Sequence, residues 1–580
     1  MKKVSEDKDK LSDSEHIENS SDTASEWDTP SSSRLITGGF YQALRDIITG
    51  TLIGLWVIVV IPRLVPQPEV MGIIKIVNTN LSLVGIFFDL GVWRGFQFYM
   101  ASSFADKNEE KILKYTQTLF FFKIINGILY NATIIIFLIY FFPNLSVDYT
   151  TAYYFTYIFV AFRWFFGFAS MFGHVITSKH RFDYDFYISL VDLASYVLFS
   201  MLWLYICNTF LFSDNIITGN VLGLVMADLC RWICIWLVQA YAINKLKILN
   251  LKKALRLKFD KPTFFQLLKY GIWVVGRSLL GQLAEIGCFL WILILKINIG
   301  NPEAVLGYWE QALISVGLFS LSTNLVQPMF PAISEAYAKN DNSLIQKYWV
   351  SSMKWYFLWS FYAFGSYVGW GELFVVTFSG ETWRKAGVLA ALISPALFIR
   401  NGNEYLMNVA NGINQPKHVM IGTALRIPIL LIGGFFLFRD HVYIGMSIVF
   451  LLIEVVFFIY LLWQIKKKIV VTTPLWTFFV PLVACIGAFV SVELITMFIN
   501  VPETIWGYLL CVIPYSLIFF VLFILLGGYE SSDYEDFEKS LKTVLKSEDK
   551  ARKIIKGLQK FARISPLYDK FAQNQLQKNN

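Results

Sequence analysis

VGIFFDLGVWRGFQFYMASSFADKNEEKIL, residues 84–113, and VGLFSLSTNLVQPMFPAISEAYAKNDNSLI, residues 316–345, are two versions of one sequence pattern. They align without a gap, 232 positions apart (84 to 316), and the matches continue into the polar loop that ends each copy. The matched residues are Val84-Gly85-Ile86-Phe87 with Val316-Gly317-Leu318-Phe319, Phe98 with Phe330, Ser102 with Ser334, and Lys107-Asn108-Glu109 with Lys339-Asn340-Asp341. Apolar low complexity does not explain matches between polar loop residues, so we interpret the pair as an internal repeat.

The repeat extends upstream of these stretches. Pro68-Glu69-Val70-Met71-Gly72 matches Pro302-Glu303-Ala304-Val305-Leu306-Gly307 with small insertions, and Arg45 falls on Arg277 at the spacing of 232 (45 to 277). An even number of membrane spans separates the copies, so both have the same orientation and are related by an axis along the membrane normal. The pattern therefore predicts two six-helix lobes that face each other across a central cleft.

Composition places the chain in a membrane. Of its 580 residues, 56% are hydrophobic and only 16% are charged, whereas a soluble domain has roughly 25% charged residues. The chain thus has enough apolar sequence for an all-α integral membrane protein with about 14 transmembrane helices, at roughly 20 residues a span. The predicted spans are 40–62, 71–103, 115–142, 151–178, 184–212, 217–244, 266–296, 304–336, 345–378, 384–411, 419–438, 441–463, 475–499 and 504–528.

The domain organisation follows from these spans. We expect a disordered, acidic and Ser-rich cytoplasmic tail, an N-lobe of spans 1–6, a basic cytoplasmic linker, a C-lobe of spans 7–12, two extra C-terminal spans, and a basic amphipathic helical tail. The boundaries are 1–35, 36–245, 246–265, 266–466, 467–528 and 529–580, in that order.

The loops predict the orientation. One alternating set is rich in basic residues, from Lys107, Lys111 and Lys114 to the run Lys466-Lys467-Lys468, and the other set is short with few of them. Basic loops stay on the cytoplasmic side. We therefore expect a multi-pass protein of the cell membrane with both termini cytoplasmic.

Charged side chains inside the spans are candidate functional groups, because such a group is costly in a bilayer unless it faces a cavity or a partner. Arg45 and Arg277 occupy matching repeat positions in the cytoplasmic half of the cleft, and Arg94 lies on span 2. A guanidinium stays charged and offers a planar fork to phosphate oxygens. These three arginines are the predicted phosphate or diphosphate ligands.

Carboxylates in the spans suggest a second chemistry. Asp89, Asp192 and Glu310 are candidates for coupling transport to protons or sodium ions. Two further acids have a basic residue one helical turn away, which predicts local compensation. These pairs are Asp228 with Arg231 and Glu404 with Arg400.

Enzyme chemistry has little support in the sequence. No P-loop, HExxH motif or nucleophile elbow is present, and the five histidines do not cluster. We expect no catalytic residue, no metal site and no cofactor, and no nucleic-acid partner. The C-terminal tail has two interpretations, docking on anionic lipid headgroups or packing on the bundle, because its apolar residues recur at helical spacing among lysines.

These features resemble the polysaccharide-flippase branch of the MOP superfamily over nearly all of residues 36–528. The resemblance is carried by the Pro-Glu-x-x-Gly entry to span 2 (Pro68, Glu69, Gly72), by residues 87–111, and by NLVQPMFPAISEAYAKNDNSLIQKY at residues 324–348. It implies a protein that moves a lipid-linked oligosaccharide, on a polyprenyl phosphate or diphosphate, from the cytoplasmic to the outer leaflet for polysaccharide or glycoprotein biosynthesis.

Flippases of the O-antigen (Wzx) and lipid II types depend on cavity arginines in their first lobe, and Arg45 and Arg94 lie on the corresponding helices here. The resemblance also implies membrane lipids and a glycosyltransferase or polymerase as partners of a monomer. The main alternative is a MATE-like multidrug or cation antiporter of the same superfamily, which would use the carboxylates. A membrane glycosyltransferase would need a long external loop, and a scaffold would leave the repeat unexplained.

Overall fold

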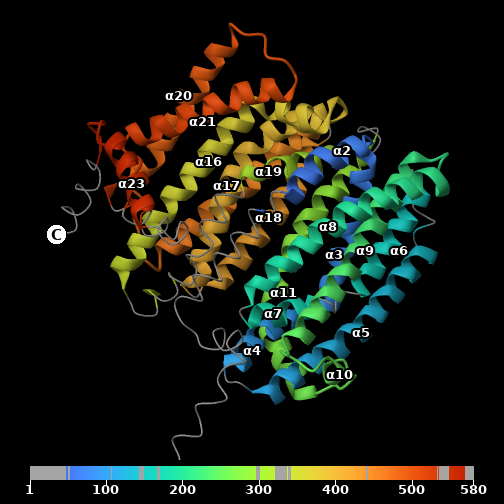
Figure 1. Ribbon diagram of the computed structural model, residues 1–580. Helices are drawn as coiled ribbons and strands as arrows, with labels where there is room; N and C mark the ends of the chain where they lie inside the picture. The colour runs from blue at the N-terminus through green and yellow to red at the C-terminus, as the bar shows by residue number, and fades with distance from the viewer. Residues whose placement is uncertain are drawn as a thin grey trace, which may run out of the picture.

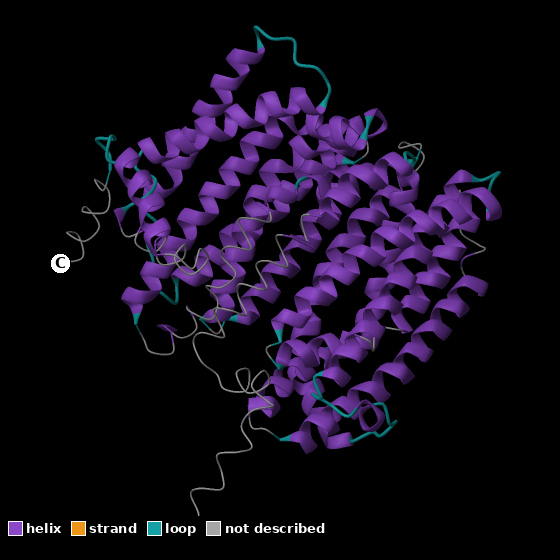
Figure 2. Cartoon of the chain, in the orientation of Figure 1, coloured by secondary structure: helices purple, strands orange, loops and turns teal. Residues whose placement is uncertain are grey.

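The computed structural model describes residues 48–568 apart from short gaps, and every structural statement below refers to this part of the chain. The gaps are 50–51, 106–107, 141, 143–148, 166–169, 180, 295–300, 320–332, 334–335, 338–340, 414, 439–441, 532, 535–537 and 539–547. The described residues form helices joined by loops, with no strand among them (Figure 2).

The first half of the described chain forms ten helical elements. They are η2 (Trp56–Val60), α2 (Ile61–Leu64), α3 (Pro68–Asp89), α4 (Val92–Ala105), α5 (Glu109–Tyr140), α6 (Thr150–Phe165), α7 (Ser170–Ser178), α8 (Phe182–Ile206), η5 (Cys207–Leu211) and α9 (Ile216–Lys245). We call them the N-lobe, and Figure 1 shows α3 to α9 in blue to green on one side of the molecule, with α2 beside the helices of the second half at the top of the view.

The second half begins with the linker helix α10 (Leu251–Ala254). The C-lobe comprises α11 (Lys261–Ile294), α13 (Pro302–Ser315), η6 (Gly317–Phe319), α16 (Asn342–Ser379), η7 (Glu381–Trp383), α17 (Arg384–Gly412), α18 (Pro416–Leu437) and α19 (Val442–Lys466). It is followed by α20 (Leu475–Thr496), α21 (Ile505–Leu525) and α23 (Glu548–Ala562).

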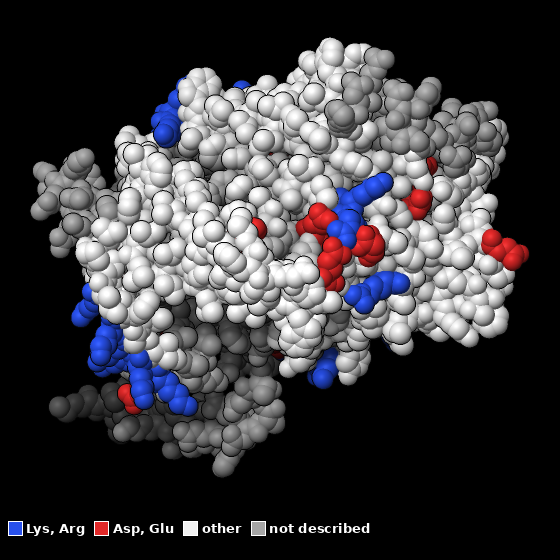
Figure 3. All heavy atoms as spheres, turned by 90° about the horizontal axis from the view of Figure 1, so that it is seen from above, with Lys and Arg blue, Asp and Glu red and all other residues white. Residues whose placement is uncertain are grey.

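The all-helical membrane class is confirmed, and most of the surface that Figure 3 shows carries no charged side chain. Nine of the described helices are long and apolar enough to cross a membrane, and Leu52–Leu64 is a shorter apolar helix. Helices lie on all of the predicted spans, although the number of fourteen crossings stays a prediction. α20 and α21 pack against α16, where the Tyr515 hydroxyl donates a hydrogen bond to the carbonyl oxygen of Tyr362 at 3.0 Å.

The predicted span 71–103 is not one continuous helix. Residues 71–103 form α3 and α4, which are separated by Leu90 and Gly91, with φ angles of 49° and 69°. A Cβ on Gly91 would lie 2.3 Å from the carbonyl oxygen of Gly271 on α11, and a Cβ on Gly271 would lie 2.0 Å from that of Gly91. The break therefore lets the backbones of two helices from different lobes touch.

The hydrophobic cores show how the lobes are joined. We call the end of the bundle with Pro68, Asn301 and Gly380 the Pro68 end, and the opposite end, with Lys111 and Lys467, the basic end. Towards the Pro68 end, residues of both lobes share one core. Towards the basic end there are two separate cores, and α11 of the C-lobe contributes Leu267 to the core of the N-lobe. The shared core includes Val70, Leu306 and Ile393, the N-lobe core Val92, Leu119 and Val175, and the C-lobe core Trp349, Leu406 and Phe457.

The contact between Gly91 and Gly271 makes a direct prediction. Gly271→Ala should lower the free energy of unfolding by roughly 1–3 kcal/mol, because the new methyl group meets backbone atoms that cannot rotate away. Gly281→Ala is the matched control on the same helix, where nothing lies within 4 Å of the added Cβ. Thermal unfolding of the detergent-purified variants measures both, and equal stability of the two would contradict the close contact.

Candidate functional site

The two copies of the repeat meet where α3 packs against α13. A Cβ on Gly72 would lie 1.8 Å from the Glu303 carbonyl oxygen, and a Cβ on Gly307 would lie 1.9 Å from the Pro68 carbonyl oxygen. Gly72 and Gly307 are the matched glycines of the repeat, 235 positions apart (72 to 307). Each copy thus places its glycine against the start of the other copy, as an approximate two-fold axis requires.

An ion pair lies close to this axis. Lys75 and Glu310 are also 235 positions apart (75 to 310), so they occupy equivalent positions, nearly one helical turn beyond the matched glycines. Lys75 Nζ lies 3.1 Å from Glu310 Oε2. Residues near a two-fold axis face their own counterparts, and here the counterparts have opposite charge. The pair links the N-lobe to the C-lobe at bilayer depth.

A cavity of about 280 Å³ surrounds this ion pair. Six of its nine lining residues are polar or charged, and three are apolar. It consists of Met71, Ile74, Lys75, Asn78, Thr79 and Ser82 of α3, Gln282 of α11, and Glu310 and Ile314 of α13. Among the described residues, the Oε1 atom of Gln282 is buried without a hydrogen-bond partner, which leaves an acceptor available to a hydroxyl or amide donor.

The lobes are hydrogen-bonded to each other at the Pro68 end. The Arg63 guanidinium donates to the carbonyl oxygens of Thr377 at 2.7 Å and Phe378 at 2.9 Å, which belong to the last turn of α16. The last carbonyls of a helix lack intrahelical partners and carry partial negative charge, so they suit a cation. The Ser379 hydroxyl donates to the carbonyl oxygen of Ile58 at 2.7 Å. These bonds hold the two lobes together at the Pro68 end.

At the basic end, α11 is the element that the lobes share. Its first turn is held by α5, where Lys114 Nζ lies 3.3 Å from Asp260 Oδ1 and the Tyr115 hydroxyl donates to Gln266 at 3.2 Å. Hydrogen bonds from Thr263, together with Lys114, hold the pKa of Asp260 below its usual value. Further along, α11 packs on α18 of the C-lobe. α11 therefore crosses from one lobe to the other.

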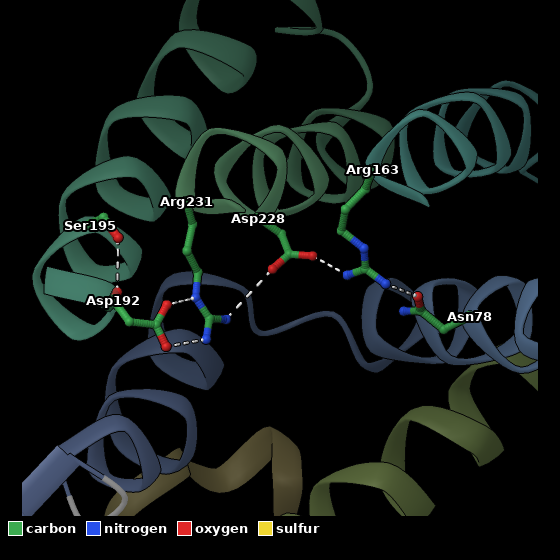
Figure 4. A network of polar contacts seen from close by, with 6 residues as sticks. All are labelled: Asn78, Arg163, Asp192, Ser195, Asp228 and Arg231. Atoms are coloured by element: carbon green, nitrogen blue, oxygen red, sulfur yellow. Dashed lines mark hydrogen bonds and ion pairs between the residues drawn. The ribbon is translucent and has the colours of Figure 1, made fainter. Parts of the chain in front are cut away.

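A chain of charges runs through the N-lobe (Figure 4). Arg163 of α6 donates to Asn78 at 3.3 Å and pairs with Asp228 of α9. Arg231 lies 3.5 Å from Asp228 and binds Asp192 of α8 with two nitrogens. Because Asn78 also lines the cavity, this chain connects the cavity wall to the outer helices of the lobe.

A second internal pair lies at the end of α3. Lys123 of α5 pairs with Asp89, the last residue before the break between α3 and α4. The ammonium group also lies 5.4 Å from the ring centre of Trp93 and 5.6 Å from that of Trp164, within range of cation–π attraction.

The structure places the predicted coupling acids but not the predicted arginines. Asp89, Asp192 and Glu310 are each bound to a basic side chain, as described above. Arg45 lies outside the described residues. α4 and α11 are described at positions 94 and 277, but the side chains of Arg94 and Arg277 lie outside the described part, so their roles stay predictions.

The two predicted local pairs have different outcomes. The Asp228–Arg231 contact is confirmed. In contrast, the described side chains of Arg400 and Glu404 form no ion pair, and Arg400 instead lies with its guanidinium carbon 5.9 Å from the ring centre of Phe450. Sequence reasoning missed the pairing of Lys75 with Glu310, although the spacing of 235 between the matched glycines could have revealed it. In the described part, no group of three metal-binding side chains comes together.

Comparison with known proteins identifies the fold. No protein-family model matches the sequence, and no curated protein matches significantly. An inward-facing multidrug resistance MATE family transporter of the MOP superfamily superposes with a TM-score of 0.59 at 12% identity, over 73% of this chain and 95% of that one. The lipid II flippase MurJ, in an inward closed conformation, superposes with a TM-score of 0.59 at 15% identity, over 83% of this chain and 97% of that one.

A third solved structure, a MOP superfamily transporter from Pyrococcus furiosus, gives a TM-score of 0.51 at 13% identity, over 75% of this chain and 95% of that one. The chain therefore has the fold of MOP superfamily transporters, which confirms the fold that the sequence resemblance implied.

The ion pair near the axis predicts the outcome of a charge swap. Lys75→Glu and Glu310→Lys each place two like charges together, which is expected to cost several kcal/mol of stability. The double variant restores opposite charges at equivalent positions and should recover most of the loss. Thermal unfolding of the three purified variants tests this, and additive losses in the double variant would exclude a direct interaction.

The N-lobe charge chain makes a separate prediction. Asp228→Asn removes the carboxylate shared by Arg163 and Arg231, and should lower the free energy of unfolding by roughly 1.5–3 kcal/mol. Asp214→Asn is the control, because Asp214 is exposed in the loop before α9 and a surface substitution changes stability by less than about 0.5 kcal/mol. If the Asp228→Asn variant is as stable as the Asp214→Asn variant, the contacts of Asp228 with Arg163 and Arg231 do not stabilise the N-lobe.

Proposed function

We propose that this protein moves a lipid-linked oligosaccharide, on a polyprenyl phosphate or diphosphate, from the cytoplasmic to the outer leaflet by alternating access. In this proposal the Pro68 end faces outward and both termini are cytoplasmic. The observation that carries the proposal is the cavity at the junction of the lobes, with a basic side chain, Lys75, at its wall. The cargo lipid would stay in the bilayer while the charged headgroup enters the cavity.

The charge balance favours an anionic headgroup. In the N-lobe and the cavity, each of the acids Asp89, Asp192, Asp228 and Glu310 is in contact with at least one base. The four basic partners are Lys75, Lys123, Arg163 and Arg231. Arg45, Arg94 and Arg277, the proposed phosphate ligands, are additional to this set, and their spans carry two further acids, Asp46 and Glu285, so that the three arginines exceed these acids by one.

The uncharged part of the lining suits the sugar. Asn78, Thr79 and Ser82 bring hydrogen-bonding groups to the cavity on α3, and Gln282 brings a buried acceptor from α11. Sugar hydroxyl groups are both donors and acceptors, so they can satisfy such groups, whereas an apolar drug would leave them unpaired.

The alternative function, a MATE-like cation antiporter, needs a membrane carboxylate that exchanges a proton or sodium ion for its substrate. Asp89, Asp192 and Glu310 are the candidates, and each of them contacts a lysine or arginine. A cation must displace this partner before it binds. We therefore place the antiporter second.

Leaflet exchange in vesicles tests the proposal. The purified chain is reconstituted into liposomes with a fluorescent polyprenyl-diphosphate oligosaccharide, and a membrane-impermeant quencher reports the outer leaflet. We expect faster exchange than in protein-free vesicles, and a roughly tenfold or greater loss in Arg277→Ala and Lys75→Ala, the size of one lost charge-assisted hydrogen bond.

Arg256→Ala is the matched control, because Arg256 is exposed in the basic linker and should leave exchange unchanged. Exchange by the unsubstituted chain at the rate of protein-free vesicles would overturn the proposal. Proton-driven efflux of an organic cation from the same vesicles would favour the antiporter.

A further inference from the structure

The C-terminal helix α23 folds back onto the basic end of α21, as both Figure 1 and its contacts show. Just beyond it, the Ser565 hydroxyl donates to the carbonyl oxygen of Leu525, the last residue of α21. On α23 itself, Ile555 and Ala562 are buried and pack with Tyr534, Ile524 and Tyr529. One of the two interpretations of the tail, packing on the bundle, therefore holds for the edge of α23 that carries Ile555 and Ala562. It does not explain the other apolar residues of the helix.

The rest of the apolar face of α23 is uncovered. Ile554, Leu558 and Phe561 are 49%, 41% and 37% exposed. They recur three and four residues apart, so they form one strip along the helix beside the buried edge of Ile555 and Ala562. We call Ile554, Leu558 and Phe561 the apolar strip. Three large apolar side chains in a row are expensive to leave in water.

The opposite face is strongly basic. The helix Glu548–Ala562 contains five basic and two acidic residues. Of the basic residues, Lys553, Lys556 and Lys560 are exposed. At 100° per residue these three lysines lie on the side of the helix away from the apolar strip. A helix with an apolar strip and a lysine-rich face is typical of one that lies in the interface of an anionic membrane.

The position of α23 decides between a membrane and a soluble partner. α21 is one of the helices able to cross a membrane, and its outward residues Leu517 and Val521 are exposed apolar side chains in its last turns. Because the end of α21 fixes the level of the bilayer surface, the attached α23 lies at headgroup level. At this level the strip is within reach of the lipid, which favours lipid over a protein from solution as its partner.

We infer that α23 is an anionic-lipid-binding element: the apolar strip enters the acyl boundary of the leaflet at the basic end, and the lysines contact lipid phosphates. Long lysine side chains can reach from a half-buried helix to the headgroups. The inference is independent of the cargo, because no residue of α23 lines the cavity.

Fluorescence of the full-length chain in nanodiscs tests the inference. A cysteine-linked environment-sensitive dye is placed at Phe561→Cys or Leu558→Cys on the strip, and at Lys553→Cys as the matched control on the basic face. Labelled protein without an added cysteine supplies the background. The discs contain phosphatidylcholine alone or with phosphatidylglycerol, and quenching is measured with nitroxide lipids and with aqueous iodide.

In phosphatidylglycerol discs, we expect nitroxide lipids to quench the two strip positions much more than position 553, and iodide to do the reverse. Lys556→Glu with Lys560→Glu should abolish the difference, since each charge near an anionic surface changes binding by about fivefold. Iodide access to the strip in anionic discs equal to that at 553 would overturn the inference, as would equal nitroxide quenching at all three positions. If the strip binds a protein and not lipid, it stays in water in these discs, and iodide then reaches it as readily as it reaches position 553.

Discussion

The structure depends on the contact between α3 and α13, where the two copies of the repeat meet. At an approximate two-fold axis each residue faces its own counterpart, so an identical repeat would place like charges together. The two copies differ at this point, so like charges do not meet. The equivalent positions 75 and 310 hold a lysine and a glutamate, whose charged groups lie 3.1 Å apart. The glycines one turn earlier keep their identity in both copies, because no side chain fits between backbones that approach so closely.

The other charged contacts between helices hold the N-lobe together. In the N-lobe, Asn78, Arg163, Asp228, Arg231 and Asp192 connect four helices, from the cavity wall on α3 to α8. Breaking such a chain leaves a partly buried charge without its partner, which is costly. The contacts within the N-lobe are therefore harder to break than the hydrogen bonds between lobes at the Pro68 end, and the proposed function, in which the lobes move as units, needs this difference.

Sequence alone predicts the helices well and the side-chain partners poorly. Long apolar runs place the spans because a helix must be long enough to cross a bilayer. The length of an apolar run cannot predict the break at Leu90 and Gly91. The break accompanies the close backbone contact with Gly271, which is 180 positions away in the sequence (91 to 271). Spacing of three or four residues shows only that two side chains share a helix face. The ion pair expected from this spacing is confirmed for Asp228 and Arg231. It is wrong for Arg400, whose described side chain lies near the ring of Phe450 and forms no ion pair with Glu404.

The location of the Lys75–Glu310 pair also constrains how the lobes could separate. Water can replace the hydrogen bonds of Arg63 at the Pro68 end, because they lie beside the loops. Lys75 and Glu310 lie deeper, on the wall of the cavity. Separation of the two without replacement would leave two partly buried charges unpaired, which is costly. In the proposed function, an anionic cargo supplies a new partner for Lys75 and a proton or cation neutralises Glu310. The ion pair would then hold the empty lobes together, and opening would be linked to the arrival of cargo.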